Sequence, residues 1–302
     1  MKKYLPFILL FVFTSSQLWA QDTVMNTPKK KTGLFLRVGL GYAFPQAGQT
    51  MDVNSNPYAA KINYSNFGSS YSFSLKKASF SAGLQGIAGV GYMVNQHIGF
   101  LVDAAIGIAP KKYTTTVDSL EIQANPANET VTQQTQTPVF VIPALLLQTG
   151  GTHYNLYVRA GIVLPAKSKV IAHIDDQLLS PATFTSPISD SNVNTINRTL
   201  ETKSSFSLGF SGAAGVSYNI NDQFKLWGEI SFVSLSLYTK ETDLTEFSVN
   251  GSNMLFNVPR SELSTKYGKS GNTVPTNSIG TVPAYSIPFS NVGINIGVSY
   301  HF

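Results

Sequence analysis

Apolar and polar residues alternate along much of the chain with a period of two, which is the spacing of a β-strand with one apolar face. The C-terminal segment shows this most clearly. Its even positions from Val292 to Phe302 are all apolar or aromatic, and the odd positions between them are Gly, Asn, Gly, Ser and His. The same alternation recurs upstream at residues 34–44, 80–92, 98–108, 154–164, 206–218 and 224–238. Each of these segments predicts one strand.

A further segment, Val139–Gln148, has apolar residues on both faces and contains Pro143. Because proline cannot donate a hydrogen bond to a neighbouring strand, we expect a bulge or a local distortion at this point. With this segment the chain has eight predicted strands.

The charged residues within the predicted strands all lie on the face opposite the apolar one. They are Arg37, Asp103, Arg159, Lys225 and Glu229. A soluble sandwich also alternates, but a membrane barrel turns its apolar face to lipid and its polar face inward. Glycines crowd the polar face, namely Gly39, Gly41, Gly83, Gly89, Gly91, Gly161, Gly209, Gly215, Gly293 and Gly297. A narrow barrel interior needs small residues and a solvated surface does not, so the pattern favours a barrel.

The connections between the predicted strands are alternately short and long. Short turns are expected near residues 95–97, 149–152 and 221–222, and long connections at 45–78, 110–137, 165–204 and 240–287. Outer-membrane barrels have short turns in the periplasm and long loops outside the cell. We therefore expect an all-β fold, an eight-stranded antiparallel transmembrane β-barrel (an up-and-down meander) with four long extracellular loops, formed by residues 33–302.

The first twenty residues have the pattern of a secretory signal peptide. Lys2 and Lys3 precede the apolar run Leu5–Phe13, and a plausible cleavage point follows Ala20. The apolar run is too short to span a bilayer as a helix. The alternative to a signal peptide is a buried N-terminal helix. We expect residues 1–20 to be removed on export to the outer membrane, and residues 21–32 to form a short periplasmic segment.

Composition excludes several classes of function. Only 12% of the residues are charged, against ~25% in soluble domains, while 43% are hydrophobic. The absence of cysteine excludes disulfides, thiol catalysis and Cys-ligated metals. The formal charge of +5 comes without a basic stripe or a glycine-rich phosphate loop, so nucleic acid is not an expected partner.

An internal repeat relates two predicted hairpins at a constant offset of 126 residues. Residues 88–92 (Ala-Gly-Val-Gly-Tyr) correspond to residues 214–218 (Ala-Gly-Val-Ser-Tyr). The same offset places Asp103 on Glu229. A duplicated hairpin is sufficient to explain the repeat.

The final strand alternates up to the last residue, with Ile296, Val298, Tyr300 and Phe302 on one face. This pattern is similar to the C-terminal signal that the barrel-assembly machinery reads. The sequence thereby resembles the small outer-membrane β-barrel proteins, which include the transmembrane domain of the OmpA family. The resemblance implies outer-membrane lipid and the assembly machinery as partners. Because the chain ends at the last strand, we do not expect the peptidoglycan-binding domain of longer members.

Candidate catalytic chemistry is sparse. The segment His173–Asp176 would suggest an acid–histidine dyad or a loose cation site at the cell surface. Ser299 and His301 share one strand face and would suggest a nucleophile with its base, but no carboxylate lies nearby in sequence. A solvated loop and a polar interior pair explain these motifs without catalysis. No His and carboxylate set has metal-ligand spacing, and we predict no enzyme activity, metal or cofactor.

The inward-facing charges are more informative, because an unpaired buried charge is costly. Arg37, Asp103, Arg159 and Glu229 lie on alternate predicted strands, so their signs alternate around the barrel wall. We expect them to form a neutral layer across the lumen, in which Arg159 bridges the two carboxylates and Lys225 lies nearer the periplasm. A structural plug and a gated ion path are the two roles that such a layer allows.

The predicted interior is just wide enough for side chains to fill, so a wide aqueous pore is not expected. We predict a structural or surface-interaction protein whose ligand, which the sequence does not name, binds through the long loops. A narrow or gated, porin-like channel for small solutes is the alternative. A surface or lipid-directed hydrolase is a third hypothesis.

Overall fold

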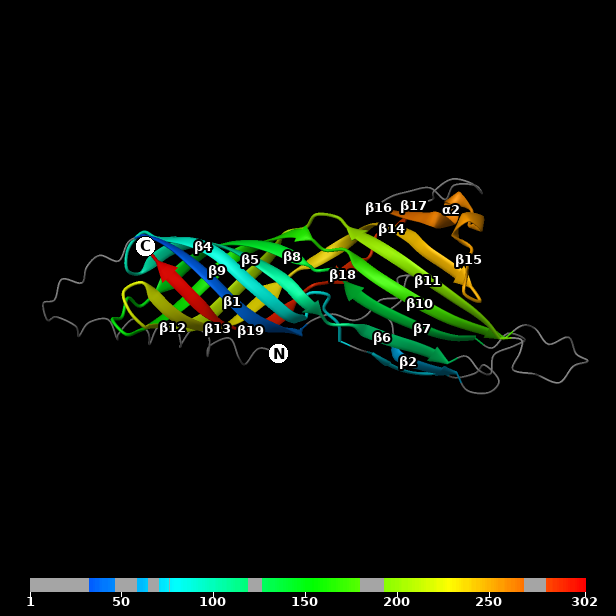
Figure 1. Cartoon of the computed structure of the whole chain (residues 1–302), viewed down its shortest axis with the longest axis horizontal. Helices are drawn as coiled ribbons and strands as arrows, with labels where there is room; N and C mark the ends of the chain where they lie inside the picture. Colours follow the sequence, from blue (N-terminus) through cyan, green and yellow to red (C-terminus); the bar gives the residue numbers. More distant parts are fainter. Residues whose placement is uncertain are drawn as a thin grey trace, which may run out of the picture. The chain divides into compact units, whose positions relative to one another are not determined.

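The computed structural model describes residues 33–46, 59–64, 71–75, 77–118, 127–179, 193–268 and 281–302 (Figure 1). The predicted signal peptide and the segment 21–32 lie outside these residues. Eight strands close into a barrel, and the remaining eleven belong to a second sheet. The described residues include no helix long and apolar enough to cross a membrane.

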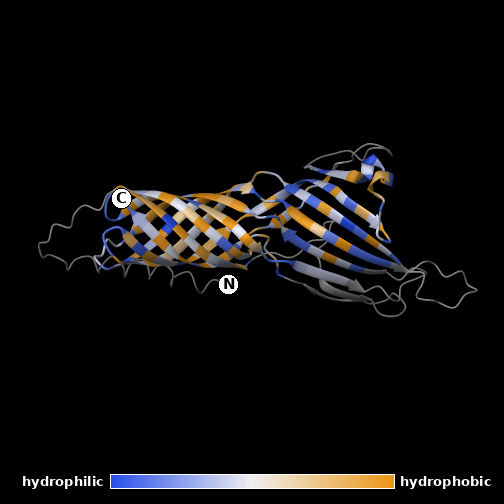
Figure 2. Ribbon diagram, in the orientation of Figure 1, coloured by the Kyte–Doolittle hydropathy of each residue, from blue (hydrophilic) through white to orange (hydrophobic). Residues whose placement is uncertain are grey.

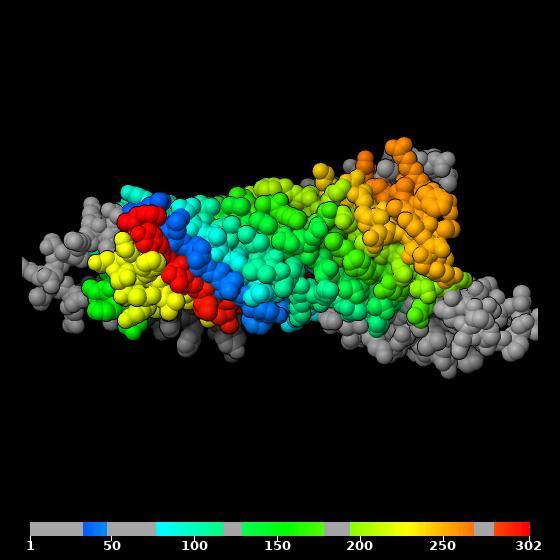
Figure 3. Space-filling view, in the orientation of Figure 1, coloured from blue at the N-terminus to red at the C-terminus, as the bar shows by residue number. Residues whose placement is uncertain are grey.

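The barrel is an antiparallel meander. Its strands are β1 (Gly33–Pro45), β4 (Gly83–Met93), β5 (Ile98–Pro110), β8 (Val139–Gln148), β9 (Tyr154–Lys167), β12 (Gly209–Asn219), β13 (Phe224–Ser234) and β19 (Asn291–His301). Each strand pairs with the next barrel strand along the chain, and β19 pairs with β1 to close the barrel. Figure 3 shows β19 and β1 side by side, in red and blue. The predicted eight-stranded barrel is therefore confirmed.

The barrel turns its large apolar side chains outward. In β1, Leu36 and Val38 are 45% and 60% exposed, whereas Arg37 between them is 5% exposed. Figure 2 shows the resulting alternation of hydrophobic and hydrophilic residues over the barrel strands. The period-two pattern in the sequence thus corresponds to an apolar outer face and a polar interior.

Aromatic side chains lie at both ends of this apolar band. At the end with the short turns, the rings of Tyr154 and Tyr218 have centroids 5.0 Å apart. At the opposite end, those of Tyr42 and Phe44 are 4.9 Å apart. Two such girdles are typical of transmembrane barrels, because aromatic rings favour the boundary between lipid and water.

The start of β4 differs from the prediction. The alternation assigns Phe80 and Ala82 to the outer face, but both are buried, at 4% and 2% exposed. The strand begins only at Gly83, whose φ of +120° is rarely accessible to residues with a side chain. This change of backbone direction ends the period-two pattern, so the residues before Gly83 point into the interior.

Pro143 in β8 interrupts one ladder without shifting it. The register between β8 and β9 is the same on both sides of Ile142–Pro143, and these two residues have no partner in β9. This break is the local distortion expected at Pro143, and the register shift between β8 and β9 lies at Val139–Phe140. Because proline has no N–H, the ladder is broken locally while the register is kept.

The long connections contain a second sheet that the sequence did not predict. Its strands are β2 (Ala59–Tyr64), β3 (Tyr71–Leu75), β6 (Tyr113–Asp118), β7 (Ala127–Thr135), β10 (Val170–Leu179), β11 (Val193–Ser204), β14 (Ser236–Val249), β15 (Ser252–Asn253), β16 (Ser264–Gly268), β17 (Thr281–Pro283) and β18 (Ser286–Pro288). The main path is β17-β16-β14-β11-β10-β7-β6-β2-β3, and β15 and β18 pair with β14. A 3-10 helix η3 (Leu255–Asn257) and a short helix α2 (Arg260–Leu263) follow β15.

Where the barrel strands meet the second sheet, buried apolar side chains fill the interior. We call this cluster the apolar plug, and its members are Ala78, Phe80, Tyr113, Phe140, Ile142, Val163, Val170, Leu235, Leu237, Ile287 and Phe289. The rings of Phe80 and Phe289 have centroids 6.2 Å apart, and the N–H of Phe80 donates to the Pro288 carbonyl at 2.9 Å. Two long connections therefore fold back into the barrel to build the plug.

Candidate functional site

Four charged side chains from alternate barrel strands meet in the interior. Arg37, Asp103, Arg159 and Glu229 are each at most 6% exposed. Arg159 contacts both carboxylates, with Nη2 at 2.6 Å from Glu229 Oε1 and Nη1 at 3.4 Å from Asp103 Oδ2. Arg37 also contacts both carboxylates, with Nη2 at 3.3 Å from Glu229 Oε2 and Nε at 3.6 Å from Asp103 Oδ1. We call this closed, neutral arrangement of alternating charges the charge ring.

Glu229 also accepts hydrogen bonds from two further buried side chains. Tyr157 Oη donates to Oε2 at 2.9 Å, and Asn295 Nδ2 donates to Oε1 at 3.2 Å. Gln85 Nε2 in turn donates to Asn295 Oδ1 at 3.0 Å. Sequence reasoning missed these three residues. The only available signal is that each is a polar side chain at an inward-facing position of its strand.

Arg37 also lies over the indole of Trp227, with its guanidinium carbon 3.8 Å from the ring centre. This distance is within the range of a cation–π interaction. The indole has room because Gly39 and Gly297, which face each other across β1 and β19, carry no side chain. A Cβ at Gly39 would lie 2.5 Å from the indole, and one at Gly297 would overlap it.

The two hairpins of the sequence repeat have equivalent turns. Asn95 Oδ1 accepts from the backbone N–H of Ile98 at 2.8 Å, and Asn221 Oδ1 accepts from that of Phe224 at 2.7 Å. In each case the asparagine side chain stands in for a backbone acceptor and closes the turn. The repeat in the sequence therefore corresponds to a repeat in the structure.

The same hairpins place a glycine opposite each carboxylate of the charge ring. Gly89 pairs with Asp103 across β4 and β5, and Gly215 pairs with Glu229 across β12 and β13. A Cβ at Gly89 would overlap Asp103 Oδ1, and one at Gly215 would lie 2.8 Å from Glu229 Cβ. Each copy of the repeat thus supplies one acidic side chain and the space that it occupies.

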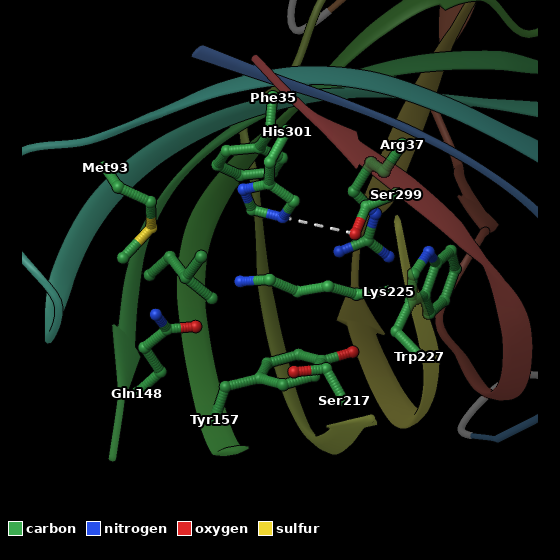
Figure 4. Close-up of a pocket in the computed structure, with 11 residues that line it drawn as sticks. Phe35, Arg37, Met93, Gln148, Tyr157, Ser217, Lys225, Trp227, Ser299 and His301 are labelled. Atoms are coloured by element: carbon green, nitrogen blue, oxygen red, sulfur yellow. Dashed lines mark hydrogen bonds between the residues drawn. The ribbon is translucent and has the colours of Figure 1, made fainter. Parts of the chain in front are cut away.

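Lys225 lies in β13 between Glu229 and the β12–β13 turn, and lines a cavity on that side of the charge ring. The cavity has a volume of about 40 Å³, which is room for a few water molecules. Its polar lining includes Arg37, Gln148, Tyr157, Lys225, Ser299 and His301. Figure 4 shows Lys225 extending into this space, which we call the basic cavity.

Ser299 and His301 lie together in the basic cavity. Ser299 Oγ is 3.4 Å from His301 Nε2, and the histidine ring stacks on Phe35 with centroids 5.0 Å apart (Figure 4). No Asp or Glu is among the residues that line the cavity. The pair therefore has no lining carboxylate to orient the histidine as in a catalytic triad.

The segment His173–Asp176 is part of β10. Side chains alternate between the faces of a strand, so His173 and Asp176 lie on opposite faces. His173 Nδ1 is 3.1 Å from Thr199 Oγ1, and Asp176 pairs with Arg198. Within the described part of the chain, no group of three or more His, Cys, Asp or Glu is placed to hold a metal ion.

Surface ion pairs join strands β11 and β14 of the second sheet. Lys203 Nζ is 2.8 Å from Asp243 and 3.2 Å from Glu241. Hydrogen bonds to these carboxylates raise the pKa of Lys203 above its ordinary value. Burial raises the pKa of Asp243, but hydrogen bonds from Lys203 and Ser264 outweigh it and hold that pKa below its ordinary value.

Ile296, Val298 and Tyr300 of the predicted assembly signal lie on the outer face of β19, and Phe302 follows the strand directly. Ile296 and Phe302 are 65% and 69% exposed. Tyr300 contacts Phe302, with ring centroids 5.0 Å apart, and the N–H of Phe302 donates to the Leu34 carbonyl at 3.0 Å. The last residue is thus attached to the first strand of the barrel.

The family described as outer membrane protein beta-barrel domain matches residues 43–258, which is most of the chain. The chain belongs to this family. This outer-membrane β-barrel protein therefore exposes its apolar outer face to lipid, with the aromatic girdles at the two boundaries.

Two solved structures are similar to the barrel protein. The outer membrane protein OprG from Pseudomonas aeruginosa is 11% identical, with a TM-score of 0.40, and the match covers 90% of this chain and 97% of that one. The E. coli outer membrane protein W is 13% identical, with a TM-score of 0.33, and the match covers 91% and 100%. No curated protein matches the sequence significantly.

Proposed function

We propose that the protein is a closed outer-membrane barrel with a structural role, and that its second sheet is a surface for interactions outside the cell. The observation that supports the closed barrel is the filling of successive levels of the interior. In β9, Arg159 belongs to the charge ring, and Val163, four residues further along the same face, belongs to the apolar plug. Solutes would have to displace both layers to cross the barrel.

Conductance measurements test this proposal. The purified protein in planar lipid bilayers is expected to show no discrete conductance steps. Steps in the wild type, with ion selectivity that changes in Arg159→Ala, would overturn the closed barrel and support the gated channel instead.

A surface role requires that the second sheet is accessible from outside the cell. The placement of this sheet in the four long connections supports an extracellular position, because outer-membrane barrels keep their short turns in the periplasm. Protease added to intact cells is expected to cut within the second sheet and to spare the barrel strands. Complete protection in intact cells, with cleavage only after the cells are broken, would place the sheet in the periplasm.

The proposal includes export, insertion and the absence of catalysis. Cleavage after Ala20 would leave Gln21 as the first residue, which N-terminal sequencing of the purified protein tests. Insertion by the barrel-assembly machinery would depend on Phe302.

The absence of catalysis is tested with lipid and peptide substrates, which the wild type is expected to leave intact. Turnover that is lost in His173→Ala or His301→Ala would establish a hydrolase.

A further inference from the structure

Lysine side chains gather where the barrel strands pass into the second sheet. We call this group the lysine collar, and its members are Lys111, Lys112, Lys167, Lys169, Lys203 and Lys240. Lys169 pairs with Glu201. Lys203 pairs with Glu241 and Asp243. The other four lysines are exposed and form no ion pair with any described residue, so the collar has an excess of positive charge.

The collar lies directly beside the apolar outer face of the barrel. Tyr238 is 52% exposed and lies two residues before Lys240. Phe206 is 70% exposed and lies three residues after Lys203. Three residues of chain span at most ~11 Å, so these lysines lie close to the lipid-facing rings. Lysine stems pack on apolar surface while their charged ends reach water. The collar is therefore at the level where the phosphate groups of membrane lipids lie.

Part of the collar surrounds a cavity of about 290 Å³ between β9 and β12. The ladder between these strands ends at the pair Val163 and Gly209, whereas β9 continues to Lys167. The two chain segments therefore separate beyond this pair and leave a gap in the wall. Phe206 lines the gap, and all of its charged lining residues are lysines, namely Lys167, Lys169 and Lys203.

The lysines of the cavity can bind an anion and keep their ion pairs. An ammonium group has three N–H donors. Lys169 places one of them on a carboxylate, and Lys203 places two. Lys167 donates to none of the described residues. A phosphate group has several strong acceptor oxygens, so it can take the remaining donors in charge-assisted hydrogen bonds.

We propose that the lysine collar binds phosphate groups of the lipids in the outer leaflet, with one phosphate in the cavity between β9 and β12. Phe206, Leu208 and Phe210, which are between 59% and 70% exposed, then lie along the acyl chains of the same lipid. This apolar surface next to the cavity favours a lipid over a soluble phosphate compound. The inference rests on the proposed extracellular position of the second sheet, which decides the leaflet that the collar meets.

Lipid retention tests the site. We would incubate the purified protein, in a nonionic detergent, with lipid A, a phosphorylated glycolipid, or with the same lipid after removal of its phosphates. Gel filtration and mass spectrometry then measure the lipid that stays bound. Lipid A is expected to be retained about tenfold more than the dephosphorylated lipid, the factor expected for one charge-assisted hydrogen bond. Equal retention would overturn the proposal. So would displacement of lipid A by an equal concentration of inorganic phosphate, because the site would then serve a soluble phosphate compound.

Variants separate the cavity from general effects of charge. Lys167→Gln is expected to lower lipid A retention about tenfold, and Lys167→Arg, which keeps the charge, is expected to preserve most of it. Arg260→Gln removes an exposed charge from α2 and is the matched control, expected to change nothing. Heat-dependent gel migration shows whether each variant is folded. Unchanged retention in folded Lys167→Gln, or an equal loss in Arg260→Gln, would refute the cavity.

Lys111→Gln combined with Lys112→Gln tests the collar away from the cavity and is expected to lower the number of lipid A molecules retained. An unchanged number in the folded double variant would overturn the collar. Retention in detergent does not depend on the orientation of the barrel. Its failure is therefore distinguishable from a failure of the extracellular position, which the protease experiment on intact cells detects.

Discussion

Arg159 donates two hydrogen bonds to the carboxylate of Glu229, from Nε at 3.1 Å and from Nη2 at 2.6 Å. The two residues come from β9 and β13, which β12 separates in the barrel, so the pair spans part of the lumen. A bidentate pair between arginine and a carboxylate has a defined geometry and is stronger than a single hydrogen bond. The stability of the barrel should therefore depend on it.

Replacing Arg159 with alanine leaves Asp103 and Glu229 to share Arg37 alone. Breaking a buried ion pair typically costs ~3–5 kcal/mol, because the remaining charge is uncompensated. Urea unfolding in lipid vesicles should show a loss of this size. Adding Asp103→Asn and Glu229→Gln should restore part of it, but not all, since Arg37 then loses its partners. Unchanged stability with new conductance in Arg159→Ala would contradict a structural role for the charge ring.

Glycines opposite the carboxylates should tolerate no side chain. Gly89→Ala would bring a methyl group into Asp103 Oδ1 and is expected to destabilise the barrel by ~1–3 kcal/mol, the usual cost of overpacking. Gly212→Ala is the matched control, because the nearest atom to its added Cβ is 4.0 Å away. Urea unfolding of both variants makes the comparison. Equal effects at the two positions would mean that the change reflects backbone entropy rather than space.

The apolar plug should contribute to stability through close packing. Phe289 is completely buried, and Phe289→Ala is expected to cost ~3–5 kcal/mol in the free energy of unfolding. Phe256→Ala removes a ring that is 81% exposed on η3 of the second sheet, away from the barrel surface, and should cost much less. Comparable losses in Phe289→Ala and Phe256→Ala would show that the plug is not packed as described.

Phe302 should matter for assembly more than for synthesis. Phe302→Ala is expected to lower the amount of folded barrel in the outer membrane, while total synthesis stays the same. Phe256→Ala serves as the control, because Phe256 is 81% exposed on η3 of the second sheet. The two populations are separated by heat-dependent gel migration. Normal amounts of folded Phe302→Ala would exclude the residue from the assembly signal.

The second sheet should become less protected in acid. Because the pKa of Asp243 is lowered in the folded protein, its contribution to stability is present above its ordinary pKa, ~3.9, and is lost as the pH falls further. Asp243→Asn should therefore exchange the amide hydrogens of β14 faster than the wild type at pH 7, and the difference should shrink as the pH falls below the ordinary pKa of aspartate and the carboxylate of the folded protein becomes protonated. Glu262→Gln on α2 should show no such difference. A difference that persists in acid would mean that the carboxylate charge is not its source.

The barrel and its four interior charges could be predicted from the sequence because both depend on the alternation of inward- and outward-facing residues along each strand. In β1, β5, β9 and β13, alternation fixes which residues face inward. The short turns before β5, β9 and β13 place Asp103, Arg159 and Glu229 at similar distances along their strands. Arg37, Asp103, Arg159 and Glu229 therefore meet where their strand positions predict. The prediction fails at Phe80, since a single glycine with positive φ changes the direction of the chain just before the strand.

The second sheet and the apolar plug could not be predicted from the alternation of apolar and polar residues. Thr, Ser and Asn in β6, β7 and β11 are equally typical of polar strands and of loops, so composition alone suggests loops. Tyr157 and Asn295 are single polar residues among many at inward positions, and only the packing of other strands brings them to Glu229. Residues such as Phe289 join the plug because a connection folds back, which no local pattern specifies.

Gly39 and Gly297 are direct partners where the first and last strands of the barrel meet, and the indole of Trp227 lies against both. A slip of one residue exchanges the faces of a strand, so a closure in which β1 is shifted by one residue against β19 would turn Val38 toward the indole in place of Gly39. Such a closure leaves no room for the ring. Burial of Trp227 therefore depends on the register in which the first and last strands pair. A barrel in which β1 and β19 pair with a slip of one residue cannot bury this ring, and such misassembled barrels should be recognisable by a solvent-exposed indole.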